Sequence, residues 1–187
     1  MLLRLLAVAP LALIVSSFTP AAPLPEEALP DAVFVAPKPV TRIIAQPDAP
    51  LEITGYTASY SAGGRYSDRG ISHDLQYRSR SQPVVAVRFG LVAFDIFNRF
   101  LDYTGGVDMD EAQPGKVKTG AWTASAYAAF SFHTGVAYVS TVRFADGTIW
   151  KADEAAITSE LRKIEADFDA KQLKDTPPPF TLPGNTE

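Results

Sequence analysis

Cysteine is absent from the 187-residue chain. Disulfide bonds, thiolate metal sites and lipid attachment through a cysteine are therefore excluded, and packing must stabilise any folded domain. A basic excess is also absent, because the formal net charge is −4. Nucleic-acid binding needs a basic face that releases phosphate counterions, so we expect no nucleic-acid partner.

Long apolar runs are lacking as well. The apolar run at residues 5–15 contains Pro10 and is shorter than the roughly 20 residues that a bilayer-spanning helix needs. It follows Arg4 and precedes small residues, a pattern typical of a secretory signal peptide at residues 1–22. A signal peptide without any cysteine in the chain indicates a bacterial periplasmic or secreted protein, with no membrane contact after cleavage. The alternative is that the run is retained as an anchor.

Proline is abundant in two segments. Because proline breaks helices and removes hydrogen-bond donors from strands, residues 23–50 are predicted to form a linker or extended arm. Within this arm, residues 32–35 and 40–45 are apolar enough to dock as short edge strands. Residues 171–187 include three consecutive prolines and are predicted to form a disordered, solvated tail.

The first half of the body, residues 51–170, has the two-residue period of β-strands. Residues 51–60 alternate between apolar and polar, which predicts a half-buried strand. The next strand is predicted to bury alternate residues, namely Ile71, His73, Leu75 and Tyr77. Residues 84–97 are apolar on both faces in their second half, which indicates a central strand covered on each side, with a bulge at Gly90.

The second half of the body contains glycine-rich connections. Residues 102–115 are predicted to form a loop with at most one short strand. Residues 119–132 are predicted to form a strand, followed by a tight hairpin at residues 133–135 and a partner strand at residues 136–144. Asp146-Gly147 is predicted to form another turn.

The period changes to that of a helix after Asp153, whose side chain is suited to capping the first free amides. The apolar residues at helical spacing are Ile157, Leu161, Ile164 and Phe168. These patterns together predict a mainly β domain over residues 51–170 with one C-terminal α-helix.

The order of these segments resembles a known family. A polar strand at residues 75–80, a strand ending in Phe94-Asp95, and Pro114-Gly115 before a further strand are similar to secreted bacterial immunoglobulin-like domains of the FxLYD type. The likeness covers less than half of the chain, and only the final aromatic-acid pair of the family motif is present. It implies an immunoglobulin-like β-sandwich that takes part in cell-envelope interactions, without catalytic residues to carry over.

The ingredients of a nucleophilic triad occur at Ser72-His73-Asp74. Consecutive strand residues point to opposite faces, so these three cannot converge. A triad assembled from distant residues around His73 or His133 stays open, although no strand-turn-helix nucleophile elbow is present.

Histidines and carboxylates provide candidate metal ligands. His73 and His133 could share a transition metal with carboxylates, but their spacing carries no ligand signature. Acidic residues around Gly105-Gly106 could offer oxygen ligands to calcium, but the spacing departs from a helix-loop-helix calcium loop. These acids are Asp102, Asp108, Asp110 and Glu111. We therefore predict a solvated acidic loop, no metal and no cofactor. If a metal were bound, the candidate ligands would be His73, His133, Asp108 and Asp110.

Tyrosines in the predicted strands could form a recognition surface, because their rings supply contact area and their hydroxyls stay polar. The candidates are Tyr56, Tyr60 and Tyr77. The alternative is that such residues form cross-strand pairs on the sheet.

The sequence thus favours an exported, non-enzymatic binding or cell-envelope-associated module, whose partner is a protein or an envelope ligand. The alternative is a small periplasmic hydrolase or metal-dependent enzyme that uses His73 or His133. A histidine, an acid and a hydroxyl that meet in a concave pocket would favour the enzyme.

Overall fold

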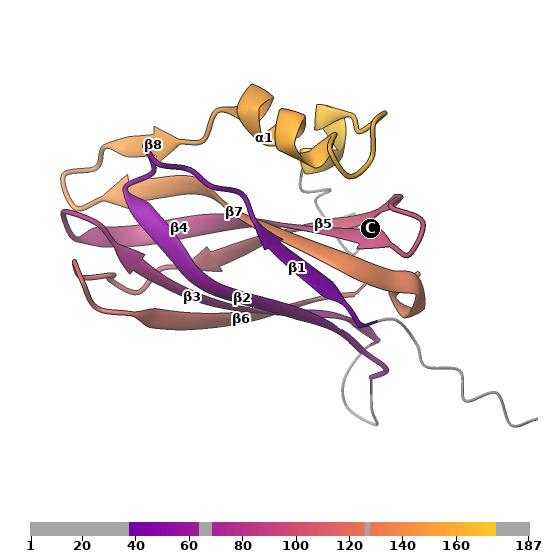
Figure 1. Cartoon of the computed structure of the whole chain (residues 1–187). Helices are drawn as coiled ribbons and strands as arrows, with labels where there is room; N and C mark the ends of the chain where they lie inside the picture. The colour runs from indigo at the N-terminus through magenta and orange to yellow at the C-terminus, as the bar shows by residue number, and fades with distance from the viewer. Residues whose placement is uncertain (1–37, 64–68, 126–127, 175–187) are drawn as a thin grey trace, which may run out of the picture. The chain divides into compact units, whose positions relative to one another are not determined.

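The computed structural model describes residues 38–63, 69–125 and 128–174, all within the second of the chain's two units, Ala36–Glu187. The expected signal peptide at residues 1–22 and the apolar residues 32–35 lie outside the described residues. The described part is mainly β, with two sheets and one short C-terminal α-helix, as the sequence predicts (Figure 1). None of its helices is long and apolar enough to cross a bilayer.

The larger sheet has five strands in the order β1-β7-β4-β5, with β8 also paired to β7. Its strands are β1 (Val40–Ile43), β4 (Val84–Asp95), β5 (Phe100–Asp108), β7 (Phe132–Phe144) and β8 (Ile149–Lys151). The smaller sheet has the order β2-β3-β6. Its strands are β2 (Leu51–Ser61), β3 (Gly70–Ser79) and β6 (Lys118–Ala124). Strand β1 runs parallel to β7, and the other strand pairs are antiparallel.

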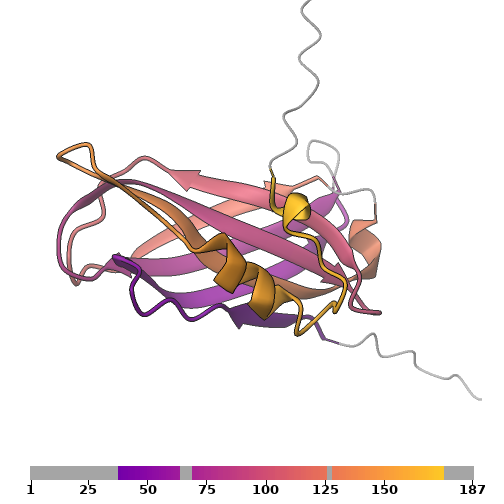
Figure 2. The ribbon, with the colours of Figure 1, turned by 90° about the horizontal axis from the view of Figure 1, so that it is seen from above.

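Strands β4 and β7 form the centre of the larger sheet and are covered on both faces. One face carries Leu91 and Ala137, which belong to the core between the two sheets. The opposite face carries Val92 and Val136, which pack with Leu161 of the C-terminal segment. Figures 1 and 2 show α1 (Glu154–Leu161) lying over this outer face. The prediction of a central strand covered on each side is therefore confirmed.

The expected bulge at Gly90 is not present. Both registers of β4 run through Gly90 without interruption, and its pairing with β7 shifts between Arg88 and Phe89 instead.

The loop predicted at residues 102–115, with at most one short strand, starts only after Asp108, because β5 takes up the first half of this segment. Gly105 lies opposite Gly90 in the ladder, and Gly106 leaves room for an indole ring. A Cβ atom on Gly106 would lie 2.9 Å from a ring carbon of Trp122. Gly106 therefore marks a close approach inside a strand rather than a turn.

The hairpin expected at residues 133–135 is also wrong. Strand β6 ends at Ala124, the 3-10 turn η1 (Ala129–Ser131) follows, and β7 then begins at Phe132 in the other sheet. Gly135 lies within β7, where a Cβ atom would come within 2.6 Å of the Tyr56 hydroxyl. Gly135 therefore leaves room for a side chain of the smaller sheet and does not form a turn.

The C-terminal helix begins as predicted, because the Asp153 carboxylate accepts hydrogen bonds from the amides of Ala155 and Ala156. Ile157, Leu161 and Phe168 are buried. The helix ends earlier than its apolar spacing indicates. After Leu161 the chain forms tighter turns, with the Lys163 and Ile164 amides donating to carbonyls three residues back.

The predicted start of the C-terminal tail (residues 171–187) is placed too early in the sequence. Residues 171–173 belong to the 3-10 turn η2 (Ala170–Leu173), in which Asp169 and Gln172 form a capping box. Leu173 packs against the outer core, which gives this turn an apolar anchor. Residues 175–187, with the three prolines, lie outside the described residues. The edge strand expected within residues 40–45 is confirmed as β1, ahead of the Leu51 start expected for the body.

Candidate functional site

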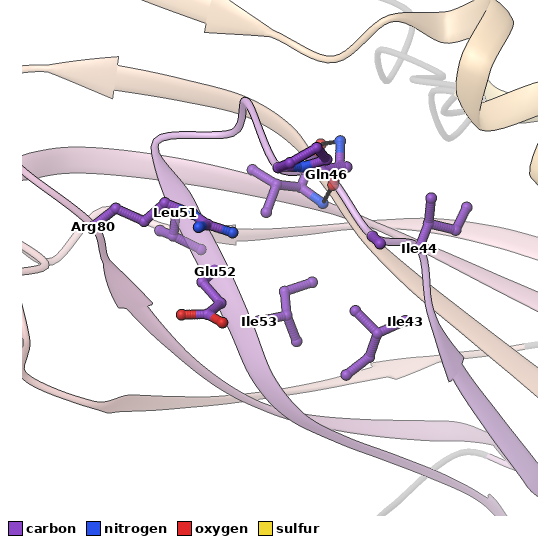
Figure 3. A pocket seen from close by; sticks show the side chains of 10 residues that line it. Ile43, Ile44, Gln46, Leu51, Glu52, Ile53 and Arg80 are labelled. Atoms are coloured by element: carbon purple, nitrogen blue, oxygen red, sulfur yellow. Dashed lines mark hydrogen bonds between the residues drawn. The ribbon is translucent and has the colours of Figure 1, made fainter.

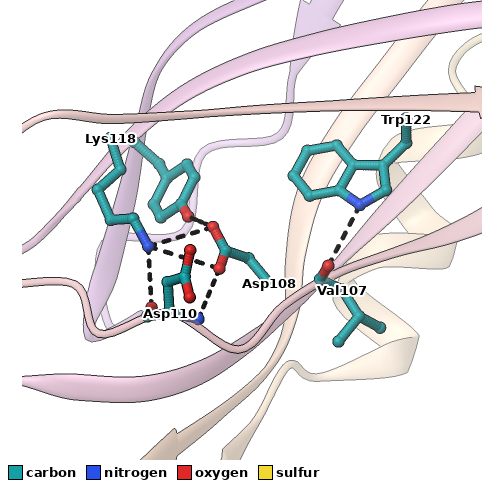
Figure 4. A network of polar contacts seen from close by, with 6 residues as sticks. Val107, Asp108, Asp110, Lys118 and Trp122 are labelled. Atoms are coloured by element: carbon teal, nitrogen blue, oxygen red, sulfur yellow. Dashed lines mark hydrogen bonds and ion pairs between the residues drawn. The ribbon is translucent and has the colours of Figure 1, made fainter.

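The two sheets are closed against each other along the side formed by β5 and β6. The half-buried Trp122 of β6 donates a hydrogen bond from Nε1 to the Val107 carbonyl of β5, at 3.3 Å (Figure 4). Its ring also lies 5.5 Å from the ring of Phe89. One indole thus joins the two layers on this side.

A groove of about 510 Å³ lies on the opposite side, where β1 and β2 run near each other (Figure 3). Its lining residues are Ile43, Ile44, Ala45, Gln46, Pro47, Leu51, Glu52, Ile53, Arg80 and Val139. Most of these side chains are apolar. Within the described part β1 is paired only to β7 and β2 only to β3, so each strand presents an unpaired edge. The groove therefore combines apolar walls with backbone edges.

The end of the groove at Gln46 is fixed by a side chain that acts as a short strand. The Val139 amide donates to Gln46 Oε1 at 2.7 Å, and Gln46 Nε2 donates to the Val139 carbonyl at 2.9 Å (Figure 3). Along β7, pairing with β1 ends at Ala137, and pairing with the β8 segment starts at Ser140. Gln46 fills the gap between them and holds the chain that follows β1 against β7.

A bulge in β2 sets which side chains face the groove. The register with β3 shifts between Ile53 and Gly55. Leu51 is buried and Ile53 is half-buried against the core before the shift, whereas Tyr56 and Ala58 point inward after it. Bulges bend a strand and change the direction of its side chains.

Charged groups lie at the rim. Glu52 in the lining pairs with Arg78 at 2.9 Å, and both side chains are substantially exposed. Arg80 also lines the groove, and its amide donates to the Pro50 carbonyl at 2.9 Å. An exposed pair of this kind contributes little to stability but can orient a charged partner.

The candidate metal ligands Asp108 and Asp110 lie at the C-terminal end of β5, where they take part in a hydrogen-bond network. The Tyr77 hydroxyl and the Lys118 ammonium both donate to Asp108, and the Asp110 amide donates to it at 2.7 Å (Figure 4). Burial by itself would raise the pKa of Asp108, but these hydrogen bonds and the nearby ammonium hold it below its ordinary value. The Lys118 ammonium thus balances the negative charge of the Asp108 carboxylate.

The remaining acids do not join this network as a metal site. Asp102 accepts a hydrogen bond from the Thr104 hydroxyl at 3.1 Å, and burial raises the pKa of Asp102. Across residues 38–63, 69–125 and 128–174, no group of three or more histidine or acidic side chains is arranged to hold a metal ion.

The two histidines lie in different sheets, His73 in β3 and His133 in β7. His73 is 1% exposed, and its Nδ1 is 2.8 Å from the Tyr56 hydroxyl. Burial lowers the pKa of His73 to about 4. His133 is half-buried, and its Nδ1 is 3.1 Å from the Thr134 hydroxyl. Their strands are not paired, so the structure does not bring them into a shared ladder position.

Ser72 and Asp74 face the opposite side of β3 from His73. Asp74 is exposed and Ser72 is half-buried, while His73 points into the core. The expectation that these consecutive residues cannot converge is confirmed.

The three candidate surface tyrosines do not form one exposed face. Tyr56 is 8% exposed and Tyr77 is fully buried, whereas Tyr60 is 37% exposed. The β2 bulge turns Tyr56 inward, and Tyr77 shares the inner face of β3 with Leu75. Burial raises the pKa of both buried hydroxyls. Sequence reasoning missed the groove residues Gln46 and Arg80, for which no local pattern exists.

Comparison with known proteins finds no matching family model, no similar curated protein and no similar solved structure.

Proposed function

We propose that the chain is an exported, non-enzymatic binding module that holds an extended, apolar peptide segment in the groove between β1 and β2. The observation that carries this proposal is that two unpaired strand edges, one from each sheet, flank the same apolar groove. An extended peptide can add to such an edge, where main-chain hydrogen bonds give affinity and alternate side chains enter pockets.

The groove is suited to a peptide with alternating apolar residues. Every second side chain of an added strand points to the same face, so these side chains would meet Ile43 and Ile53. Arg80 and Glu52 at the rim would contact the polar flanks of the segment. An extended edge beside exposed apolar side chains is otherwise an aggregation hazard, which a resident ligand would remove.

A hydrolase or metal-dependent enzyme based on His73 or His133 draws no support from the geometry. The ring of His73 lies between the sheets with one nitrogen engaged by Tyr56, and the groove lining contains neither histidine. The candidate ligand Asp108 is engaged by Tyr77 and Lys118.

We also propose that the two layers form a β-sandwich, since residues of both sheets share one core. The immunoglobulin part of the expectation has less support. A constant-type immunoglobulin domain would place strands in the orders 1-2-5-4 and 3-6-7, whereas the described strands follow 1-7-4-5 and 2-3-6.

Export and location in the periplasm or outside the cell are proposals that rest on residues 1–22. Mass spectrometry of the protein from its native envelope fraction tests them. Processing predicts loss of the first residues, and an intact Met1 in a cytosolic fraction contradicts export.

The peptide proposal is tested by selecting phage-displayed nonapeptides on the full chain. We expect enriched peptides to alternate apolar and polar residues, and to slow amide hydrogen exchange in β1 or β2. Ile43→Glu should weaken their binding at least tenfold. Ile149→Glu is the matched control, because Ile149 is 53% exposed and Ile43 is 42% exposed, and both lie in strands paired to β7. Failure to enrich any peptide, or equal binding by both variants, contradicts the proposal.

A further inference from the structure

The exposed aromatic side chains of the described part gather at one end of the two sheets. They are Tyr60, Phe97 and Phe130, which are 37%, 79% and 68% exposed. Ile96, next to Phe97, is 46% exposed. Single exposed apolar side chains are common on protein surfaces, whereas a cluster of exposed aromatic groups marks an interaction site.

Strand register places these residues together. Asp95 at the end of β4 pairs with Phe132 at the start of β7, and the Ile96 amide donates to the Ser131 carbonyl at 3.1 Å. The turn that carries Phe97 therefore lies against η1, which carries Phe130. Tyr60 is the second-last residue of β2, and η1 also contacts β2.

The turn that carries Phe97 is held in shape by its own polar groups. The Asp95 carboxylate accepts hydrogen bonds from the amides of Phe97 and Arg99, both at 2.8 Å. Asn98 adopts a left-handed backbone with φ of 61°. Phe97 is thus presented outward on a fixed turn that requires no folding upon contact with a partner.

The opposite end differs in chemistry. Its exposed apolar side chains in the described part are aliphatic, namely Val107, Met109, Val117 and Ile149. Aromatic rings are suited to the boundary between water and an apolar phase. A tyrosine ring can insert while its hydroxyl stays hydrated, and a phenylalanine ring inserts as an apolar group. The aromatic composition therefore sets the Phe97 end apart from the Met109 end.

Two further observations favour a bilayer as the partner. Exposed cations Lys38, Arg69 and Arg99 lie in the segments at this end, where they can meet anionic headgroups. The chain also enters the described part here, since Val40 pairs with Thr134, which pairs with Phe94. Before processing, the apolar run at residues 5–15 is therefore joined to the domain through the aromatic end.

We propose that the end formed by Tyr60, Ile96, Phe97 and Phe130 contacts the surface of a lipid bilayer, with the aromatic rings in the headgroup boundary. This contact departs from the expectation of a domain free of membrane after cleavage. It is independent of the peptide groove, which is lined by other residues.

The absence of native cysteine permits a site-specific test in the full chain. Phe97→Cys and Met109→Cys are each labelled with bimane and mixed with vesicles of phosphatidylethanolamine and phosphatidylglycerol. These positions form a matched pair, because Phe97 is 79% and Met109 is 80% exposed at opposite ends. We expect a blue shift and quenching by brominated lipid at position 97, at least threefold stronger than at position 109.

Adding Phe130→Ser to the labelled Phe97→Cys protein should at least halve the shift, and neutral phosphatidylcholine vesicles should give a weaker shift. Circular dichroism and the melting temperature establish that the variants are folded. Equal responses at positions 97 and 109, or a position-97 response that depends on protein concentration without vesicles, would overturn the proposal, the latter in favour of an interface between copies.

Discussion

The side-chain amide of Gln46 makes both hydrogen bonds that a neighbouring strand would make with Val139. It occupies the stretch of the β7 edge between β1 and the β8 segment. A residue outside any strand thereby completes the ladder of the most central part of the larger sheet.

Replacing Gln46 should therefore destabilise the fold. Gln46→Leu leaves the Val139 amide and carbonyl without these partners, and we expect a loss of about 1 to 3 kcal/mol in the free energy of unfolding. Urea denaturation monitored by tryptophan fluorescence measures this loss. Gln82→Leu, at an exposed position in the β3–β4 connection, serves as the control. Equal midpoints for the two variants would show that the Gln46 bonds contribute nothing.

The buried His73 should make stability fall in mild acid. Burial lowers the pKa of His73 to about 4 in the folded protein, below its ordinary value of 6.5. The unfolded chain therefore takes up a proton at this residue first, and stability decreases from about pH 6.5 down to about pH 4, by roughly 3 kcal/mol.

Unfolding free energies at pH 7, 5.5 and 4.5 test this dependence. His73→Gln should flatten the profile over this range, whereas His133→Gln at the half-buried position should preserve it. An unchanged slope in His73→Gln would assign the acid sensitivity to other groups.

Removing the Tyr77 hydroxyl should affect Asp108. In Tyr77→Phe the carboxylate loses a donor that lowers its pKa, so we expect the pKa of Asp108 to rise and the protein to lose about 1.5 to 3 kcal/mol at pH 7. Because the Asp108 pKa is depressed in the folded state, its contribution is present at neutral pH and disappears as pH falls through the folded pKa.

A carboxyl-carbon NMR titration of Asp108 measures this change directly. Tyr60→Phe, at a more exposed tyrosine, should leave the Asp108 titration where it is in the native protein. A titration that is identical in Tyr77→Phe and native protein contradicts the assigned hydrogen bond.

Two aromatic truncations should differ in cost. Phe94 is fully buried, with its ring 6.4 Å from Phe100 and 6.0 Å from Phe168, so Phe94→Ala should cost about 3 to 5 kcal/mol. Trp122 is half-buried rather than fully enclosed, so Trp122→Ala should cost less despite the larger side chain. Thermal and urea denaturation of both variants give the comparison, and a more costly Trp122→Ala would reverse this ranking.

The sequence could predict features set by neighbouring residues. Ile71, His73, Leu75 and Tyr77 alternate in β3, and all four side chains are buried as that period indicates. Asp153 caps α1 through its own carboxylate, and Gly147 turns the chain with φ of 87° after Asp146. Each of these depends on local geometry, which the order of residues contains.

Features that depend on distant contacts were not predictable. Gly106 and Gly135 sit inside strands because Trp122 and Tyr56 approach them from the other sheet, and a single sequence shows only a glycine that could equally form a turn. The bulge before Gly55 reverses the side-chain alternation of β2, so that Tyr56 points inward. The groove arises where β1 and β2 meet, and its residues Gln46 and Arg80 acquire their roles only through sheet assembly.

Sealing the β7 edge with β1, Gln46 and β8 has a consequence for shortened versions of the protein. A fragment that starts at Leu51 would lack the first two of these covers, and the N-terminal half of β7 would expose bare amides and carbonyls beside the apolar core. Such an edge recruits strands from other molecules. Proteolytic trimming ahead of Leu51 would thus promote aggregation, so the short N-terminal strand protects the protein against it.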